Sequence, residues 1–340
     1  MDAQTAGGRS GHDVGGSHQK MKAIVQDIYG PPDVLQLKEV DKPLITDDEA
    51  LVRVRASSVN PADWHFIRGS PFLLRLAGSG LSRPKNPVPG LDVAGVVEAV
   101  GKNATQLRPG EEVFGSCRGA YAEYARVAKK HLLPKPQNLT FEQAAAVPLA
   151  ATTALQGLRD QANVQAGQTV LVIGASGGVG TFAVQIAKAL GAEVTGVCST
   201  RNVEMVRSIG ADHVIDYTQA DFVAGGQLYD LIFQLAGTHA PSECRRALKP
   251  KGTLLLCSGD GRLGGIGRIL AGMVSSPFVS QRLVTWVATM NNEDLATLAE
   301  LIEAGKVKPV IDRTYELRET PAAVRYLEEG HTRGKVVITV

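Results

Sequence analysis

The sequence has few of the residues that build metal lobes, disulfide frameworks or membrane anchors. Its 340 residues include four scattered cysteines and no C-x-x-C pair, which argues against a zinc lobe and favours a reducing compartment. No apolar run approaches the roughly 18 to 20 residues that a membrane-spanning helix needs. The 36 basic and 34 acidic residues leave a net charge of +2, which excludes a strongly basic nucleic-acid binder and an acidic tail. We therefore expect a near-neutral cytoplasmic protein with no membrane span and no nucleic-acid partner.

The first third of the chain has a β pattern. Residues 1–20 are rich in glycine and serine with almost nothing to bury, so they are predicted to form a flexible tail. From Met21, residues 21–148 begin with short β-branched runs separated by turn signals such as Gly30-Pro31-Pro32. This pattern predicts a partly open antiparallel β-barrel, with strands at 23–26, 51–59, 93–100, 112–114 and 120–127.

The periodicity becomes helical after Thr140, and residues 149–289 alternate strands with helices. Alternation at this spacing implies right-handed βαβ crossovers and a parallel sheet buried on both faces. We therefore predict a Rossmann-type doubly wound domain at 149–289, in a chain of the α/β class. Residues 290–340 are predicted to return to the first domain through a helix and a last strand at 335–340.

A glycine-rich turn carries the strongest local signal. The buried strand Thr169–Ile173 is followed at once by the turn Gly174–Gly180 and a helix to Leu190. In this context backbone N–H groups can approach a pyrophosphate at the positive end of the helix dipole. The spacing is not a strict G-x-G-x-x-G, and a glycine turn without a ligand is the alternative. The flanking strand and helix favour dinucleotide binding, with contacts from Ser176, Gly177, Gly178 and Val179.

The end of the next strand bears on the choice of cofactor. The strand ends in Ser199-Thr200-Arg201 and offers no carboxylate to a ribose 2′-hydroxyl, so NADPH is predicted over NADH. Arg201 is the candidate 2′-phosphate ligand, the alternative being a solvated surface residue. Tyr217 could add a hydroxyl to the same pocket or could be a packing residue. Loops at Ala236 and Ser258 should also line the cofactor, because ligands bind at the carboxyl ends of parallel strands.

Several motifs together resemble the medium-chain dehydrogenase/reductase family. The resemblance covers residues 21–340 and is to the zinc-independent quinone oxidoreductase (zeta-crystallin-like) branch. It rests on Val59–Trp64, Pro89–Gly95, Leu107–Gly110, Gly119–Tyr124, Gly174–Gly180, Gly210–Asp212 and Gly334–Ile338. It implies a GroES-like substrate domain at 21–148 and 290–340, and an active site in the cleft between the two domains. Zinc-dependent relatives carry a cysteine where this chain has Asn60 and a histidine where it has Leu91, so no metal site is expected.

The resemblance also assigns site residues. It places Asn60 and Thr153 near the nicotinamide. For Asn60, the alternative is a turn that shapes the cleft. For Thr153, the alternative is a side-chain hydrogen bond to the carbonyl oxygen of residue i−4. Asp63 and His65 are further catalytic candidates, although a lone histidine beside an aromatic ring is more often structural. The segment 282–288 often forms an edge strand at a dimer interface in this family, so a homodimer is an expected assembly.

The function expected from the sequence is an NADPH-dependent, zinc-independent reductase of quinones or α,β-unsaturated carbonyl compounds. Hydride would pass to a small-molecule substrate in the interdomain cleft, and a donor would meet the charge that develops on the carbonyl oxygen. Two alternatives stay open. One is a zinc-free carbonyl or alcohol oxidoreductase, and the other is a non-catalytic NADPH-binding sensor.

Overall fold

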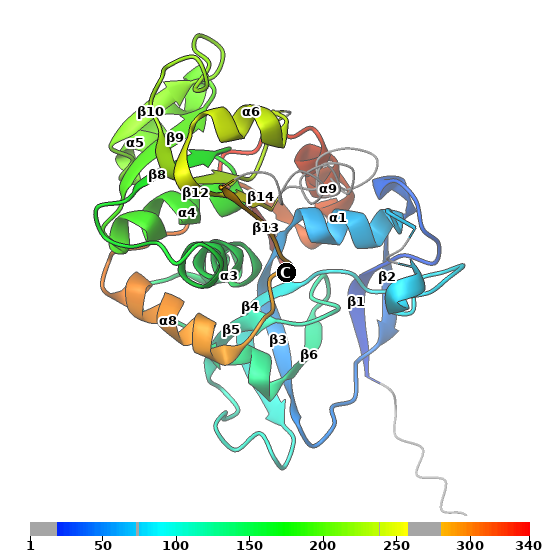
Figure 1. The fold of residues 1–340 in the computed structure, drawn as a ribbon. Helices are drawn as coiled ribbons and strands as arrows, with labels where there is room; N and C mark the ends of the chain where they lie inside the picture. The colour runs from blue at the N-terminus through cyan, green and yellow to red at the C-terminus, as the bar shows by residue number, and fades with distance from the viewer. Residues whose placement is uncertain (1–18, 73–74, 238, 258–279) are drawn as a thin grey trace, which may run out of the picture.

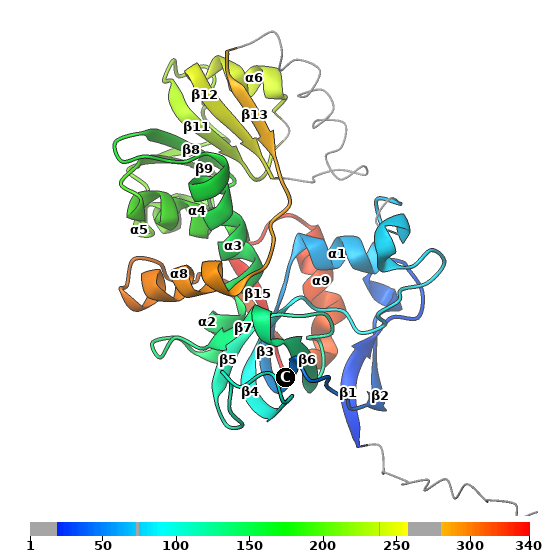
Figure 2. The ribbon, with the colours of Figure 1, turned by 60° about the horizontal axis from the view of Figure 1, so that its bottom comes forward.

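The computed structural model describes residues 19–72, 75–237, 239–257 and 280–340, and two large β-sheets divide the chain (Figure 1). Figure 2 shows the six-stranded sheet in the upper half and the seven-stranded sheet in the lower half, with helices α3 (Pro148–Gln156) and α8 (Asn292–Glu303) between them. α8 contacts α3 and also β7 of the lower sheet. The two halves therefore share packed helices as well as a covalent connection.

The seven-stranded sheet combines the first third of the chain with its C-terminus. Its order is β14-β15-β3-β4-β5-β7, with β6 paired to β3; within this sheet, the described strands pair antiparallel except for the parallel pair β14–β15. The order has two free ends, so the predicted partly open antiparallel β domain is confirmed and it is not a closed barrel. The strands are β3 (Glu49–Val59), β4 (Asp92–Val100), β5 (Glu112–Ser116), β6 (Tyr124–Ala128), β7 (Leu132–Pro134), β14 (Ile311–Glu316) and β15 (Lys335–Thr339).

A separate antiparallel pair precedes this sheet. β1 (Lys20–Val25) overlaps the strand predicted at 23–26 but begins three residues earlier, and it pairs with β2 (Gln36–Asp41). The sequence pattern predicted no strand at β2. No residue of β2 is buried, so the strand lacks the alternation of apolar and polar side chains that marks a half-buried strand.

The six-stranded sheet confirms the predicted Rossmann-type domain. All its pairs are parallel and its order is β10-β9-β8-β11-β12-β13, which reverses direction between β8 and β11. Ligands of doubly wound sheets bind at the carboxyl ends of the strands beside such a reversal. The strands are β8 (Thr169–Ile173), β9 (Glu193–Cys198), β10 (His213–Asp216), β11 (Tyr229–Gln234), β12 (Leu248–Leu256) and β13 (Arg282–Thr285).

Helices cover both faces of this parallel sheet, which explains the continuous apolar runs of its strands. Val170 and Val172 of β8 belong to one buried cluster, and Leu171 and Ile173 belong to another on the opposite face. The remaining α-helices are α1 (Pro61–Arg68), α2 (Phe141–Ala145), α4 (Gly178–Ala189), α5 (Val203–Ser208), α6 (Pro241–Arg246) and α9 (Thr320–Glu328). Short 3₁₀ and π segments are η1 (Pro32–Val34), η2 (Arg75–Ser79), η3 (Lys129–His131), η4 (Gly157–Gln161), η5 (Thr200–Asn202) and η7 (Leu317–Glu319).

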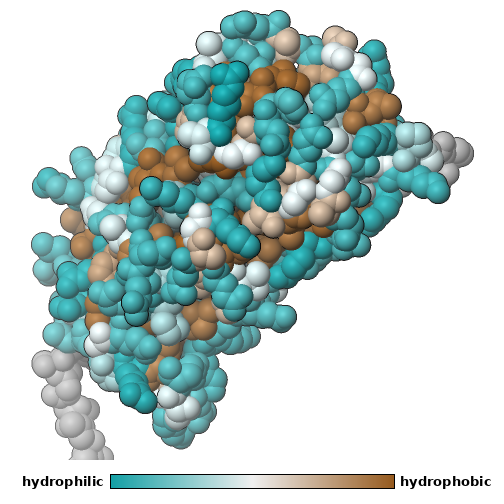
Figure 3. All heavy atoms as spheres, turned by 90° about the vertical axis from the view of Figure 1, so that its left-hand side faces the viewer, coloured by the Kyte–Doolittle hydropathy of each residue, from teal (hydrophilic) through white to brown (hydrophobic). Residues whose placement is uncertain are grey.

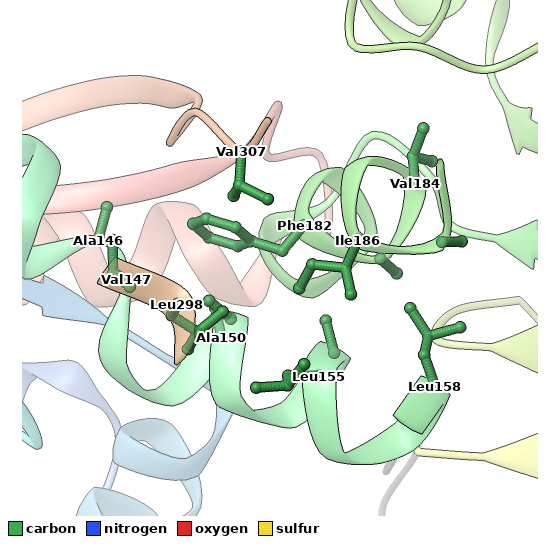
Figure 4. Packing of buried hydrophobic residues seen from close by; sticks show 14 of the residues in the cluster. Ala146, Val147, Ala150, Leu155, Leu158, Phe182, Val184, Ile186, Leu298 and Val307 are labelled. Atoms are coloured by element: carbon green, nitrogen blue, oxygen red, sulfur yellow. The ribbon is translucent and has the colours of Figure 1, made fainter. Parts of the chain in front are cut away.

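The largest buried cluster joins the helices between the sheets. Figure 4 shows Phe182 of α4 pointing toward Val307 and toward Val147 and Ala150 at the start of α3, with Leu298 of α8 close by. Burying an aromatic side chain of this size contributes on the order of 2 kcal/mol or more. This packing holds α4, whose N-terminus follows the glycine turn, in a fixed position against the rest of the chain.

The surface mixes hydrophobic and hydrophilic side chains. On the face shown in Figure 3, hydrophobic side chains form strips between hydrophilic ones, not one broad patch. Within the described residues, no helix is both long enough and apolar enough to cross a membrane.

Candidate active site

The glycine turn forms a cradle between β8 and α4. Gly174 has φ +85°, a conformation that favours glycine. A Cβ on Gly180 would lie 2.1 Å from the Gly174 carbonyl oxygen, so glycine there lets the helix pack closely. Among the described residues, a Cβ on Gly177 would meet just that same carbonyl oxygen, at 3.4 Å. The first N–H groups of α4 lack acceptors within the helix, and the cradle fits a dinucleotide pyrophosphate.

The C-terminal strand contacts this cradle directly. Gly334 donates its N–H to the Ser176 carbonyl oxygen at 2.8 Å, and a bridge pairs Gly334 with Gly177. The next residues form β15, which pairs with β3 so that Val336 lies opposite Val59. The chain order alone does not predict this contact, which brings the end of β3 close to the glycine turn.

A polar pocket lies at the ends of β9 and β10. We name it the Arg201 pocket; it is lined by Ser199, Thr200, Arg201, Tyr217 and His331 and measures about 560 Å³, including space open to solvent. Arg201 donates through Nη2 to the His331 carbonyl oxygen at 2.7 Å, which leaves its other N–H groups for a ligand. Tyr217 is 61% exposed, so it is not the packing residue considered as the alternative. His331 is a lining residue that the sequence did not predict.

Asn202 connects the cradle with the Arg201 pocket. Its Nδ2 donates to Ser176 Oγ at 3.0 Å and to Ser199 Oγ at 3.2 Å. Asn202 is buried, and its Oδ1 has no hydrogen-bond partner in the described part of the chain. An unsatisfied buried acceptor is costly, so it fits a site where a ligand hydroxyl donates. Sequence reasoning missed Asn202, although it directly follows Arg201.

A carboxylate does approach the Arg201 pocket, from β10. Asp216 accepts from Thr200 Oγ1 at 2.5 Å, from Thr218 Oγ1 at 2.8 Å and from Gln219 Nε2 at 3.1 Å. The hydrogen bond from Thr200 lowers the pKa of Asp216, so the group is ionised at neutral pH. Asp216 is not among the lining residues of the pocket, and its oxygens are already bonded. Asp216 was not predicted near the cofactor, because the prediction was drawn from the end of β9 alone.

Asn60 and Asp63 meet at the start of α1. Asn60 is the N-cap residue, Pro61 holds the first helical position, and Asp63 accepts from the Asn60 backbone N–H at 2.9 Å. Asn-Pro-x-Asp is a typical helix start, because the third helical residue can satisfy the N-cap backbone. Asn60 Nδ2 also donates to Asp63 Oδ2 at 3.2 Å. Both side chains are 2% exposed or less.

Asp92 of β4 supports the Asn60 amide. Its Oδ2 accepts from Asn60 Nδ2 at 2.8 Å and from Ser58 Oγ at 2.6 Å. Its Oδ1 accepts from the backbone N–H of Leu149 at 2.9 Å, in the first turn of α3. The Asp92 side chain thus links β4 to the end of β3 and to the start of α3.

Lys335 completes the buried group. Its Nζ donates to Asn60 Oδ1 and lies 3.7 Å from Asp92 Oδ2. The side chain is buried, as is that of Asp92. We name Asn60, Asp63, Asp92 and Lys335 the Asp63 cluster. Asp92 and Lys335 were not predicted as site residues, but each is a charged residue beside an apolar strand run, a signal that a buried partner is required.

Burial sets the protonation of this cluster. It raises the pKa of Asp63 to about 7, and the negative charge of Asp92 adds to the rise, whereas the Asn60 hydrogen bonds and the Lys335 charge oppose it. Burial lowers the pKa of Lys335, against the attraction of the two carboxylates. Asp63 is therefore the member that exchanges a proton near neutral pH. Tyr121, whose hydroxyl donates to the Ser58 carbonyl oxygen at 3.3 Å, keeps its proton because burial raises its pKa.

Asp63 also lines a cleft of about 460 Å³, including space open to solvent. The wall is largely apolar, with Tyr29, Phe66 and Leu91 among its residues. Asp63 supplies its sole carboxyl among the described lining residues. The Arg118 guanidinium, also at the wall, lies 5.4 Å from the Phe66 ring centre. A proton-exchanging acid in an apolar cleft can protonate a flat organic molecule.

The other predicted residues have different surroundings. Thr153 is buried and donates Oγ1 to the Leu149 carbonyl oxygen at 2.7 Å, the i−4 bond considered as its alternative. His65 Nδ1 bonds the Ser70 carbonyl oxygen at 2.8 Å, and its ring packs edge-on against Trp64 at 4.4 Å. One ring nitrogen of His65 thus helps to close the turn after α1.

Two predicted positions flank the cradle and one falls outside the structure. Val179 lies in the first turn of α4 and packs against the large buried cluster. Ala236 follows β11 at the sheet reversal, and a Cβ on Gly174 would lie 2.7 Å from its side chain. Ser258 lies outside the described residues. Within the described residues, no group of three or more histidine, cysteine or acidic side chains could hold a metal ion.

Comparison with known proteins gives relatives over nearly the whole chain. Residues 46–137 match the alcohol dehydrogenase GroES-like domain, and residues 209–338 match the zinc-binding dehydrogenase family. A 2-methylene-furan-3-one reductase from Solanum lycopersicum is 36% identical over 335 residues, covering 94% of this chain and 79% of the relative. An NADPH-dependent alkenal/one oxidoreductase from Arabidopsis thaliana, described as chloroplastic, is 35% identical and covers 94% of this chain and 80% of its own length.

A solved structure shows the same arrangement. The quinone oxidoreductase from Coxiella burnetii superposes with a TM-score of 0.84 at 31% sequence identity, covering 95% of this chain and 100% of that one. The similarity therefore includes both halves of the molecule and the way in which they are joined.

Proposed function

Because the chain belongs to the medium-chain dehydrogenase/reductase family of oxidoreductases, we propose that it reduces quinones or α,β-unsaturated carbonyl compounds with NADPH. The observation that carries the proposal is the meeting of two sites. The contact from Gly334 to Ser176 joins the glycine cradle to the strand that leads into the Asp63 cluster, and Asp63 lines an apolar cleft. A site of this kind pairs a dinucleotide with a proton donor.

The chain's own residues would handle the proton. Bound NADPH supplies a hydride to an electron-poor carbon of the substrate. Asp63, with its pKa raised to about 7, holds a proton that can pass to the substrate oxygen or to the neighbouring carbon as negative charge develops there. The Asn60 amide is occupied by Asp63, Asp92 and Lys335, so its role is to hold Asp63 in place.

NADPH is favoured over NADH by the Arg201 pocket. Its arginine, its tyrosine hydroxyl and its Ser199 hydroxyl are donors that suit a phosphate, whereas the Thr200 hydroxyl donates to Asp216; the open volume accommodates one phosphate. Asn202 Oδ1, which has no hydrogen-bond partner among the described residues, fits a ribose hydroxyl.

Product analysis tests the proposed function. The protein is mixed with NADPH and a panel of an enal, an enone and a benzoquinone, and the loss of nicotinamide absorbance is followed. We expect turnover, with the C=C bond of the enal and enone reduced and the carbonyl retained. Reduction of the C=O bond instead would favour a carbonyl reductase, and NADPH binding without turnover of any substrate would favour a sensor.

We also propose that two copies pair through β13. Among the described strands this one is last in the order of the six-stranded sheet, and Val287 just beyond it is 90% exposed. Unpaired sheet edges are suited to strand addition from a second chain. Sedimentation analysis should give twice the chain mass, and a single-chain mass at micromolar concentration would contradict the pairing.

A further inference from the structure

A lysine is buried where the two halves of the chain meet. Lys335 is 3% exposed, and burial of an ammonium group is costly unless the group is paired and hydrogen-bonded. Its neighbour Gly334 bonds Ser176 of the glycine turn, and a Cβ on Gly178 would lie 3.0 Å from Lys335 Cδ. The side chain thus runs along the cofactor cradle and ends at the Asp63 cluster. β15, which it begins, lies beside β3 in Figure 2.

The ammonium group bonds an amide more closely than it pairs with a carboxylate. Lys335 Nζ donates to Asn60 Oδ1, lies 3.4 Å from the Val59 carbonyl oxygen and is 3.7 Å from Asp92 Oδ2. Asp92 already accepts three other hydrogen bonds. Charge balance for Asp92 therefore explains only part of the arrangement, and Asn60 is the nearer partner.

Lys335 determines which way round the Asn60 amide lies. The two ends of an amide are alike in shape but opposite in hydrogen bonding. With Oδ1 on the ammonium group, Nδ2 faces the carboxylates of Asp63 and Asp92, and every donor meets an acceptor. The flipped amide would place its oxygen against two carboxylates and its NH₂ group against an ammonium group. Lys335 thereby makes Asn60 a donor to Asp63.

We propose that Lys335 is a positioning residue for proton transfer: it orients Asn60 toward Asp63 and, by its charge, sets how readily Asp63 releases its proton. Loss of this charge makes Asp63 hold its proton more tightly. The inference rests on the proposed function only in saying that the Asp63 proton passes to a substrate. The state of the proton itself can be measured without cofactor or substrate.

Other groups around Asp63 favour either its protonated or its ionised form. Asp92 favours the protonated form of Asp63, and Lys335 favours the ionised form. Tyr121 and Cys117 remain protonated because burial raises their pKa values. Further described charged or titratable side chains at the cleft wall are those of Arg118 and Tyr29. Asp92 and Lys335 are thus the pair whose removal, singly and together, separates the two effects.

Carbon-13 NMR of labelled aspartate in the cofactor-free protein provides the test. The Asp63 signal, identified by its loss in Asp63→Asn, is titrated in wild type and in Lys335→Met. We expect its midpoint to move to higher pH, because loss of a nearby positive charge favours the protonated carboxyl. The kcat profile should move in the same direction. Lys20→Met, which removes an exposed lysine, is the matched control and should leave the midpoint unchanged.

The double variant Asp92→Asn/Lys335→Met keeps the test valid if the single variant fails to fold. It removes both buried charges, so the midpoint should return toward the wild-type value. An unchanged Asp63 midpoint in Lys335→Met, or a double-variant midpoint no higher than that of Asp92→Asn alone, would overturn the proposal.

NADPH titration, followed by fluorescence, separates positioning from direct cofactor binding. We expect Lys335→Met to bind NADPH nearly as tightly as wild type. A loss of more than about tenfold in affinity, with no movement of the Asp63 midpoint, would make Lys335 a cofactor ligand and overturn the positioning role.

Discussion

The Arg201 pocket and the Asp63 cluster are the two polar regions of the candidate active site, and they differ most in exposure. Tyr217 of the pocket is 61% exposed, whereas Asp63 of the cluster is 1% exposed. In the pocket, water screens the charges, which suits the reversible phosphate binding proposed for Arg201. In the cluster, desolvation moves the pKa of a carboxyl to about 7. The difference in exposure is thus the physical basis for proposing binding in one region and proton exchange in the other.

Replacing the proton donor should give the largest effect. Asp63→Asn keeps the shape of the side chain but removes the exchangeable proton, so kcat for an enone should fall by about 10²- to 10⁴-fold. NADPH affinity should change little, because Asp63 is not in the cradle or the Arg201 pocket. Steady-state kinetics and a fluorescence titration measure the two quantities. Asp27→Asn, at an exposed carboxylate, is the control, and an Asp63→Asn enzyme with near-normal kcat would remove Asp63 from the mechanism.

Removal of a buried charge should lower the free energy of unfolding more than removal of an exposed charge. Lys335→Met leaves Asp92 uncompensated in the interior, and the free energy of unfolding should fall by about 3 to 5 kcal/mol. Lys20→Met breaks the Lys20–Asp41 pair, whose side chains are more than half exposed, and should cost about 0 to 1 kcal/mol. Urea unfolding of both variants measures the difference. Equal losses would show that burial does not distinguish the two pairs.

Cofactor preference should depend on the exposed region. Arg201→Ala should weaken NADPH binding by about tenfold to a hundredfold, the contribution of a hydrogen bond to a charged group, while NADH affinity stays the same. Arg207→Ala is the matched control, since Arg207 is a surface arginine of α5 paired with Glu204. Parallel titrations with both nucleotides measure the effect. Equal losses for the two cofactors would refute a 2′-phosphate contact.

The pH dependence of stability should report the buried carboxyl. The pKa of Asp63 is about 7 in the folded chain, above its ordinary value of 3.8, so the folded state holds the proton more tightly. Its contribution to stability is therefore fully present below about pH 4 and is lost as pH rises toward 7. The loss relative to Asp63→Asn should be roughly 1.4 kcal/mol for each pH unit in that window. Urea midpoints at several pH values measure it, and parallel curves for the two proteins would contradict the assignment.

The sequence pattern predicted the fold, which is confirmed, and proposed the cofactor-binding residues, because both depend on local order. A buried strand, a glycine turn and a helix follow one another without a break at Thr169–Ala189, and Arg201 lies at the end of the next strand. The strand β2 was missed because it buries no residue and so has no periodicity to detect.

The Asp63 cluster was found only in part. Asn60 and Asp63 are three residues apart and share a helix start, so the local sequence brings them together. Asp92 and Lys335 come from strands far away in the chain, and only the pairing of β3 with β4 and with β15 places them beside Asn60. His65 was predicted as a catalytic candidate, and its Nδ1 bonds the Ser70 carbonyl oxygen in the turn after α1.

The sequence by itself determined the two large sheets, the glycine turn and the position of Arg201 after the next strand, since short-range periodicity and turn chemistry specify them. The tertiary structure decided which charges are buried together. Lys335, 275 residues from Asn60, reaches its amide because the C-terminal strand returns to β3, and removal from water then gives Asp63 a proton to exchange at neutral pH. Electrostatic effects of this size depend on burial, and burial is a property of the folded chain.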